Sequence, residues 1–155
     1  MNLILWRHAE AEDAPEGGDD LARSLTPRGE REAARVGAWL DRTLPEVTRV
    51  LCSPARRCEQ TALALGRKFK LMPELAPDMG VEALLKAARW PDARQPVLIV
   101  GHQPTLGQTV ALLLGMAEGT CPVRKGGVWW LRARERHGQL QAVVVTVQSP
   151  ELLAI

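Results

Sequence analysis

Apolar and polar residues follow one another along the chain in a pattern that predicts short buried strands separated by helices. The largely apolar runs at 3–6, 49–52 and 97–100 indicate strands covered on both faces, because such strands have little polar alternation. Between these runs, apolar residues recur every three or four positions, which is typical of helices that bury one stripe. The stripes predict helices from residue 26, from residue 53 to Gly66, over 79–89, and from about residue 105 to Gly115.

Capping residues mark where two of these helices are expected to begin. Thr26-Pro27 and Ser53-Pro54 each place a hydroxyl side chain before a proline, and we interpret both pairs as a cap followed by the first helical turn. Residues 9–25 are acidic, contain Gly17-Gly18 and show no period, which predicts a long exposed loop between the first strand and the first helix.

The end of the chain has a different pattern. Two strands near 127–134 and 140–147 meet around His137-Gly138, which predicts a hairpin. Together with the alternating strands and helices, this predicts an α/β fold, a three-layer α/β/α sandwich around a mostly parallel sheet with a C-terminal antiparallel hairpin. The length suits one core, and no repeat or linker interrupts it, so we expect a single domain over 1–155.

Composition excludes several classes of partner. The net charge is +2 with acids and bases interspersed, so there is no clustered basic face for nucleic acid. No apolar run approaches the roughly 18 residues of a membrane span, and the apolar start is too short for a signal peptide. Three cysteines without a paired framework favour a reducing compartment. We therefore expect a cytoplasmic protein that binds neither nucleic acid nor membrane.

Polar residues of types that occur in catalytic sites follow three of the predicted strands. Arg7-His8 ends the first, Ser53 follows the second with Arg57 one turn later, and Gly101-His102 follows the third. In open α/β sheets, ligands bind beyond the carboxyl ends of the strands. Each residue alone is more often a solvated or structural side chain. Their joint occurrence at three successive strand ends predicts a shared site if the strands are parallel neighbours.

Five segments of the chain, in this order, resemble the histidine phosphatase superfamily, and within it the short SixA-type phosphohistidine phosphatases. They span residues 3 to about 107, and the small size of the chain fits the SixA-type branch. The matching segments are Leu5-Trp6-Arg7-His8-Ala9-Glu10-Ala11, Leu25-Thr26-Pro27-Arg28-Gly29, Ser53-Pro54-Ala55-Arg56-Arg57-Cys58-Glu59-Gln60-Thr61, Pro73-Glu74-Leu75 and Val100-Gly101-His102-Gln103-Pro104.

The resemblance assigns roles to individual residues. It implies that His8 is the histidine that becomes phosphorylated, that Arg7 and Arg57 bind the phosphoryl group, and that His102 is the second histidine in contact with it. Arg23 is a weaker candidate for lining the pocket, and a loop arginine in water is an equally good interpretation. The resemblance implies no cofactor and no metal.

These residue types suit phosphoryl transfer without a metal. A neutral imidazole can attack phosphorus and form a covalent phosphoenzyme that water then hydrolyses. Nearby arginines disfavour protonation of His8, and guanidinium groups match phosphate oxygens. Helices after Ser53 and His102 are expected to present N-terminal amides to the same anion.

Rival phosphatase and metal motifs fit poorly. A cysteine phosphatase needs five residues between cysteine and arginine, whereas Cys52 and Arg57 have four between them. The chain has no Walker loop, and its scattered histidines and cysteines lack zinc-site spacing.

The proton donor for the leaving group and the substrate class stay open in the sequence. Glu74 and Asp78 are candidate acids, and Glu10 and Glu12 are weaker ones. A labile phosphorus–nitrogen bond tolerates a missing acid better than an alkyl ester, which favours phosphohistidine on a partner protein. The alternatives are a phosphatase for a small phosphorylated metabolite and a non-catalytic phosphate-binding module. A mutase is disfavoured because 155 residues leave little room for the insertions that would enclose a sugar phosphate.

Overall fold

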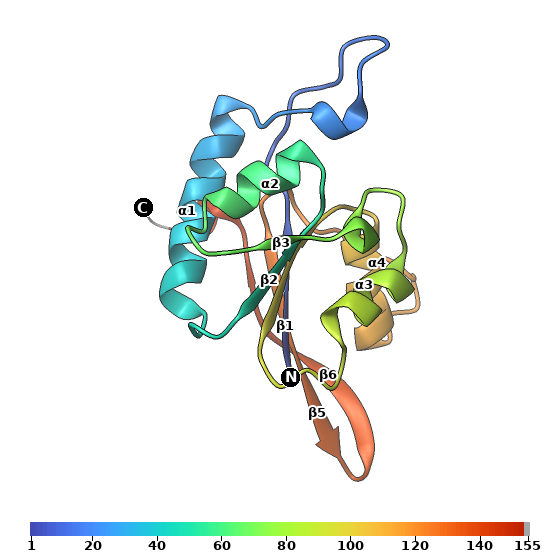
Figure 1. Cartoon of the computed structure of the whole chain (residues 1–155). Coiled ribbons are helices and arrows are strands. Elements are labelled where there is room, and N and C mark those ends of the chain that lie inside the picture. The colour runs from blue at the N-terminus through green and yellow to red at the C-terminus, as the bar shows by residue number, and fades with distance from the viewer. Residues whose placement is uncertain (154–155) are drawn as a thin grey trace.

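The computed structural model describes residues 1–153 and contains a six-stranded mixed sheet between two pairs of helices (Figure 1). The strand order is β3-β2-β4-β1-β5-β6. The strands are β1 Asn2–Arg7, β2 Arg49–Cys52, β3 Lys70–Leu71, β4 Val97–Gly101, β5 Val128–Arg136 and β6 Gln139–Gln148. The helices are α1 Pro27–Thr43, α2 Arg56–Leu63, α3 Val81–Ala88 and α4 Thr105–Leu114, with 3₁₀ turns η1 Asp20–Ala22, η2 Pro73–Leu75 and η3 Pro150–Leu152. The predicted three-layer α/β/α sandwich is confirmed.

The two helix layers cover opposite faces of the sheet because side chains of a strand alternate between its faces. Ile4 and Trp6 of β1 pack in a core with α1 and α2. Leu3 and Leu5 of the same strand pack in a second core with α3 and α4. Figure 1 shows the sheet nearly edge-on between these two layers. No helix within residues 1–153 has the length and apolarity needed to cross a bilayer.

Three parallel strands lie side by side at the centre of the sheet. β4 pairs with β1 on one side and with β2 on the other, both in parallel. Arg7 is opposite Gly101, and Cys52 is opposite Val100. The carboxyl ends of the three strands therefore meet at one edge, as the sequence predicts.

Helix boundaries agree with the prediction at some ends and differ at α2. Thr26 caps α1, its hydroxyl accepting from the Gly29 amide, and α4 ends at Leu114 with Gly115 as a left-handed C-cap. The interpretation of Ser53 as a helix cap is wrong, because α2 begins only at Arg56 and has no side-chain cap. The helix also ends at Leu63, three residues before Gly66. The Ser53 hydroxyl is instead hydrogen-bonded to the ring of a histidine that follows β4.

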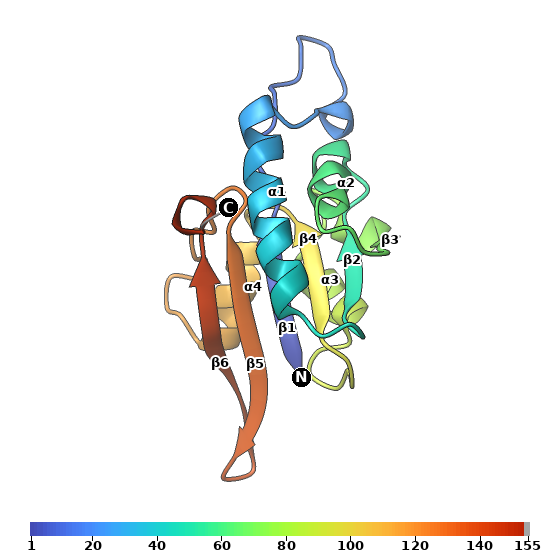
Figure 2. The same cartoon turned by 90° about the vertical axis from the view of Figure 1, so that its left-hand side faces the viewer.

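The C-terminal hairpin is confirmed, and it projects beyond the rest of the sheet (Figures 1 and 2). His137 and Gly138 both have positive φ, 54° and 74°, which is the geometry of a tight two-residue hairpin turn. The strand β3 was not predicted, since two residues carry no periodic signal. It adds a parallel edge beside β2.

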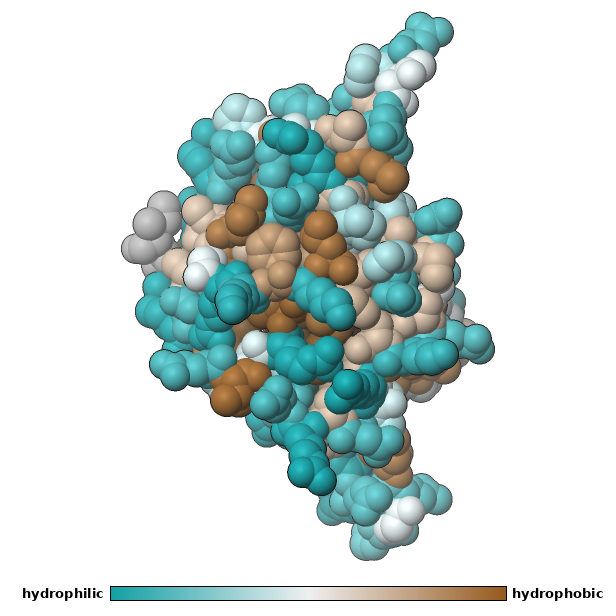
Figure 3. Space-filling model, in the orientation of Figure 1, coloured by the Kyte–Doolittle hydropathy of each residue, from teal (hydrophilic) through white to brown (hydrophobic). Residues whose placement is uncertain are grey.

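The loop over residues 9–25 is anchored at both ends and exposed between them. Ala9 and Leu25 are buried, and Ala11 forms an isolated bridge with Leu25, so the expectation of exposure fails at the two ends. The middle of the loop rises from the body of the protein with a largely polar surface (Figure 3). A short turn, η1, folds back toward α2 (Figure 1).

Candidate active site

The carboxyl edge of the sheet brings together the four residues expected there, which we call the active-site cluster: Arg7, His8, Arg57 and His102. Arg7 ends β1, His8 and His102 directly follow β1 and β4, and Arg57 lies in the first turn of α2. The rings of His8 and His102 have centroids 5.4 Å apart. Arg57 Nη2 lies 3.4 Å from His102 Nδ1. Residues far apart in the sequence thus share one site because their strands are neighbours.

The hydrogen bond of His8 fixes which ring nitrogen is free to react. Nδ1 lies 2.7 Å from the carbonyl oxygen of Ala9. A carbonyl oxygen only accepts, so Nδ1 carries the proton and the neutral ring keeps its lone pair on Nε2. Burial lowers the pKa of His8 to about 3, and the charges of His102, Arg57 and Arg7 add to this against the Ala9 hydrogen bond. His8 is therefore a neutral imidazole near pH 7.

The backbone around His8 is tied to three other parts of the fold. The amide of Ala9 donates to Thr61 Oγ1 of α2 at 3.1 Å, and the Thr61 hydroxyl donates to the Arg57 carbonyl. The His8 amide donates to Gly101, and the His8 carbonyl accepts from Gly126. These bonds hold the ring against small displacements, which matters because a reacting nitrogen must be aligned with phosphorus.

His102 is oriented by the serine that the sequence pattern marked as a helix cap. Its Nε2 lies 2.7 Å from Ser53 Oγ, and Cys58 Sγ lies 3.4 Å from the same nitrogen. Arg57 can only donate, so Nδ1 of His102 faces it as an acceptor and Nε2 donates to Ser53. Burial, followed by the charge of Arg57, lowers the pKa of His102 to about 4.

The two arginines of the cluster are held in different ways. Arg57 is 4% exposed, and its Nη1 and Nη2 donate to the carbonyl oxygen and carboxylate of Asp20 at 2.8 and 3.2 Å. Arg7 donates from Nη1 to the Val123 carbonyl at 2.8 Å, and burial lowers its pKa. The Nε atoms of both have no partner among the described residues, so both cations keep unused donor capacity.

Arg23, the weaker candidate, lies at the rim of the cluster. Its Nε donates to the Glu12 carbonyl at 2.7 Å, and its Nη1 lies 3.2 Å from Asp20 Oδ1. Asp20 therefore connects Arg23 to Arg57. Nothing in the sequence singled out Asp20, because one acidic residue in an acidic loop has no distinguishing pattern.

The four candidate acids lie in unlike environments. Glu10 accepts from the Thr26 hydroxyl at 2.7 Å and so supports the start of α1. Glu12 is exposed and contributes its carbonyl to Arg23. Glu74 is exposed and lines a small pocket that His102 also lines, whereas Asp78 is exposed and is not part of that pocket. Glu74 is thus the candidate acid that shares a pocket with His102.

The expectation that the helix after His102 offers its first amides to an anion is wrong for two of them. The amide of Leu106 donates to the His102 carbonyl at 2.9 Å. The amide of Gly107 donates to the Gln103 side chain at 2.6 Å. Gln103 therefore caps α4 internally, and the cationic character of the cluster comes mainly from Arg7 and Arg57.

Close packing explains why separate motifs of the sequence occur together. Gly29 of α1 lies so near the backbone of Glu10 that an added Cβ would come within 2.1 Å of the Glu10 carbonyl oxygen. The Leu25 amide donates to the Gln60 side chain of α2 at 2.7 Å. The segments around His8, Thr26 and Arg57 are thereby docked against one another.

Within residues 1–153, no three His, Cys, Asp or Glu side chains are grouped so as to hold a metal ion.

Comparisons with known proteins agree with this geometry. The model of the histidine phosphatase superfamily (branch 1) matches residues 3–80. Phosphohistidine phosphatase SixA of Escherichia coli is 33% identical over 121 residues, which cover 73% of this chain and 74% of that protein. An uncharacterised protein of Mycobacterium tuberculosis is 37% identical over 119 residues, which cover 74% of this chain and 72% of that protein. A structure of the protein histidine phosphatase SixA with tungstate superposes with a TM-score of 0.77 at 28% identity, covering 98% of this chain and 99% of that one.

Proposed function

The chain belongs to the histidine phosphatase superfamily, in its SixA-type branch, and we propose that this phosphatase removes phosphoryl groups from phosphohistidine on a partner protein. The observation that carries the proposal is the Nδ1 of His8 bound to the Ala9 carbonyl, 2.7 Å away. It leaves the Nε2 lone pair free beside two arginines and a second histidine. The tungstate bound by the SixA relative is a tetrahedral oxyanion, which supports a phosphoryl site in this branch.

In the first proposed step, His8 Nε2 attacks phosphorus in line with the bond to the leaving nitrogen. A bond forms between Nε2 and phosphorus, and the substrate phosphorus–nitrogen bond breaks. Nδ1 of His8 keeps its proton, which stays hydrogen-bonded to the Ala9 carbonyl oxygen. The phosphorylated ring is therefore an imidazolium, and the carbonyl stabilises its new positive charge. The low pKa of His8 keeps the attacking ring neutral at physiological pH.

Arg7, Arg57 and His102 act on the transferring group. Guanidinium forks donate to the equatorial oxygens, where negative charge is spread in the transition state. Arg7 is pre-positioned by the backbone carbonyl of Val123, and Arg57 by its burial at the start of α2 beside His102. His102 is held by Ser53 at Nε2. It donates to the same group from Nδ1, the nitrogen that faces Arg57, in the tautomer that has its proton on Nδ1 and accepts from the Ser53 hydroxyl at Nε2. Pre-orientation of this kind lowers the cost of reorganisation during the reaction.

In the second proposed step, water attacks the phosphorus of phosphorylated His8. The bond from phosphorus to Nε2 breaks and returns its electron pair to Nε2. The protons of the water stay with the product, which leaves as dihydrogen phosphate, and His8 is again the neutral ring with its proton on Nδ1. No other reactant is consumed.

The choice of phosphohistidine rests on how the leaving group obtains its proton. The distal nitrogen of a phosphorylated imidazole can hold a proton before the bond breaks, so a neutral imidazole leaves without an acid from the protein. An alkyl alkoxide has no such internal proton. Glu12, Glu74 and Asp78 are exposed, so none of these carboxyl groups is enclosed in the site as a positioned proton donor. The site therefore suits a phosphoramidate better than an alkyl ester.

A phosphatase for a small phosphorylated metabolite is the second candidate. The observation that favours it is Glu74, which lines a pocket together with His102 and could deliver a proton to an alcohol. A panel of substrates separates the two: a phosphohistidine protein, phosphoramidate, sugar phosphates and an aryl phosphate, each with and without chelator.

We expect kcat/KM for the phosphoramidates to exceed that for alkyl esters by at least about 100-fold, roughly the contribution of one general acid. Glu74→Gln is expected to leave phosphoramidate hydrolysis nearly unchanged, and chelator is expected to have no effect. A sugar phosphate as the best substrate, with most of its turnover lost in Glu74→Gln, would establish the metabolite phosphatase instead.

A further inference from the structure

One residue outside the predicted cluster occupies the donors of Arg57. Asp20, from η1 of the long loop, presents its carbonyl oxygen to Nη1 at 2.8 Å and its carboxylate Oδ2 to Nη2 at 3.2 Å. The guanidinium is almost wholly buried, whereas 58% of the Asp20 side chain is exposed. Arg57 is thus reached from the solvent side by two oxygen acceptors of a single residue.

An arginine recognises a phosphoryl group with the same geometry, in which two phosphoryl oxygens face the two terminal nitrogens of the guanidinium. The proposed function requires those same nitrogens for the substrate, and one guanidinium cannot give its strongest hydrogen bonds to both. We propose that Asp20 is an internal competitor of the phosphoryl group, which a ligand must displace from Arg57 in order to bind. This inference rests on the proposed function and names a further residue that governs which anions the site accepts.

The surroundings of Asp20 allow it to be displaced. η1 has three residues, none of them buried, so a small change in the loop moves the carboxylate without disturbing either core. Partial burial acts to raise the pKa of Asp20, but hydrogen bonds and charge from Arg23 and Arg57 outweigh it and lower the pKa, so Asp20 is an anion near pH 7. The carboxylate end of this ion pair is mostly exposed, which weakens the pair. A doubly charged phosphoryl group bound by Arg7 and Arg57 together is therefore expected to displace the carboxylate.

Displacement has a second consequence at the rim. Asp20 Oδ1 lies 3.2 Å from Arg23 Nη1, and Arg23 is separately anchored through its Nε to the Glu12 carbonyl. Removing the carboxylate frees that terminal nitrogen while the anchor stays. Return of Asp20 to Arg57 also opposes retention of the phosphate product, so the contact favours product release and discriminates against weakly bound anions.

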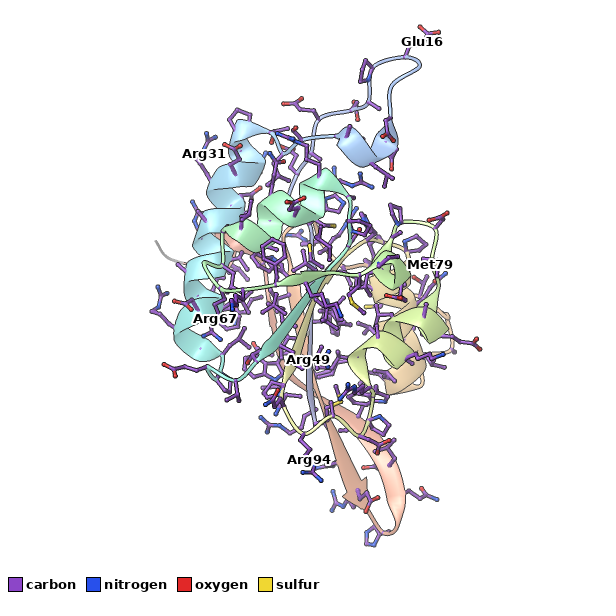
Figure 4. All side chains as sticks on the ribbon, in the orientation of Figure 1. Glu16, Arg31, Arg49, Arg67, Met79 and Arg94 are labelled. Atoms are coloured by element: carbon purple, nitrogen blue, oxygen red, sulfur yellow. The ribbon has the colours of Figure 1, made fainter. Side chains whose placement is uncertain are left out.

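Calorimetric titration of inorganic phosphate into the full chain tests the proposal. Asp20→Asn and Asp20→Ala are expected to bind phosphate about fivefold to tenfold more tightly than the natural protein, with the alanine variant at the upper end. Glu16→Gln is the matched control: it removes one negative charge from the same loop, but Glu16 lies at the tip of that loop, away from the helix α2 that contains Arg57 (Figure 4). It is expected to change phosphate affinity less than about twofold.

Unchanged phosphate affinity in both Asp20 variants, with thermal unfolding showing that they are folded, would overturn the proposal. Equal tightening in Glu16→Gln would also overturn it, because the effect would then be one of net charge. Arg57→Ala separates this inference from the proposed function. If phosphate binding needs Arg57 but ignores Asp20, only this inference fails; if Arg57→Ala binds phosphate normally, the proposed phosphoryl site fails with it.

Discussion

Ser53 Oγ lies 2.7 Å from His102 Nε2, and this hydrogen bond joins the carboxyl ends of β2 and β4. The serine also accepts from the Ala55 amide at 3.2 Å, which fixes its hydroxyl in place. Both groups are buried, so water cannot replace the serine without entering the site. Ser53 is therefore a positioning residue that acts through His102.

Ser53→Ala is expected to lower kcat by about tenfold to 100-fold, the range that follows from a relaxed orientation of a reacting group. Ser53→Thr, which keeps the hydroxyl, should recover part of the loss. Steady-state kinetics with a phosphoramidate measures both, and Ser149→Ala is the control because its side chain caps nothing. A change in KM alone would argue against a role through His102.

Arg57→Lys is expected to lower kcat/KM by at least about 100-fold, because lysine keeps the charge but loses the two-pronged donor geometry. Arg56→Lys is the matched control, since the neighbouring arginine is exposed and donates to Ser24 instead. Both variants are assayed with one substrate at one ionic strength. Similar losses in the two variants would show that only general positive charge matters.

The two buried histidines give stability a defined dependence on pH. The pKa values of His8 and His102 are lowered to about 3 and about 4, whereas an unfolded histidine titrates near 6.5. Between these values the unfolded chain binds more protons than the native one, so the free energy of unfolding falls as pH falls from about 6.5 toward 4.

Each histidine contributes a slope of up to about 1.4 kcal/mol per pH unit within that window. His8→Gln removes one of the two, so urea unfolding of this variant at pH 7 and pH 5 should show a smaller difference than the natural protein shows. An equal difference in both proteins would mean that His8 is not buried as a neutral ring.

Gly29→Ala is expected to destabilise the fold by about 2 kcal/mol or more, because its Cβ would meet the Glu10 carbonyl oxygen at 2.1 Å and force α1 away from the loop. Gly80→Ala is the control, since an added Cβ there would meet no neighbouring atom within 4 Å and the φ of Gly80 is negative. Denaturant unfolding compares the two. A stable Gly29→Ala would show that α1 is not docked this closely.

The central strands and the cluster could be predicted from the sequence because buried parallel strands have continuous apolar runs, and their ends must meet. Asp20 and the true role of Ser53 could not. Both depend on long-range contacts: Asp20 reaches Arg57 across 37 positions, and Ser53 reaches His102 across 49. A local hydroxyl–proline pattern looks the same whether the hydroxyl caps a helix or orients an imidazole.

The central claim is that His8 carries the phosphoryl group during turnover. The most direct measurement is acid-free quenching of the enzyme with a ³²P-labelled phosphoramidate, followed by mapping of the labelled peptide. We predict base-stable, acid-labile label on the peptide that contains His8, and neither label nor turnover in His8→Ala. Normal turnover in His8→Ala, or label on any other residue, would contradict the account.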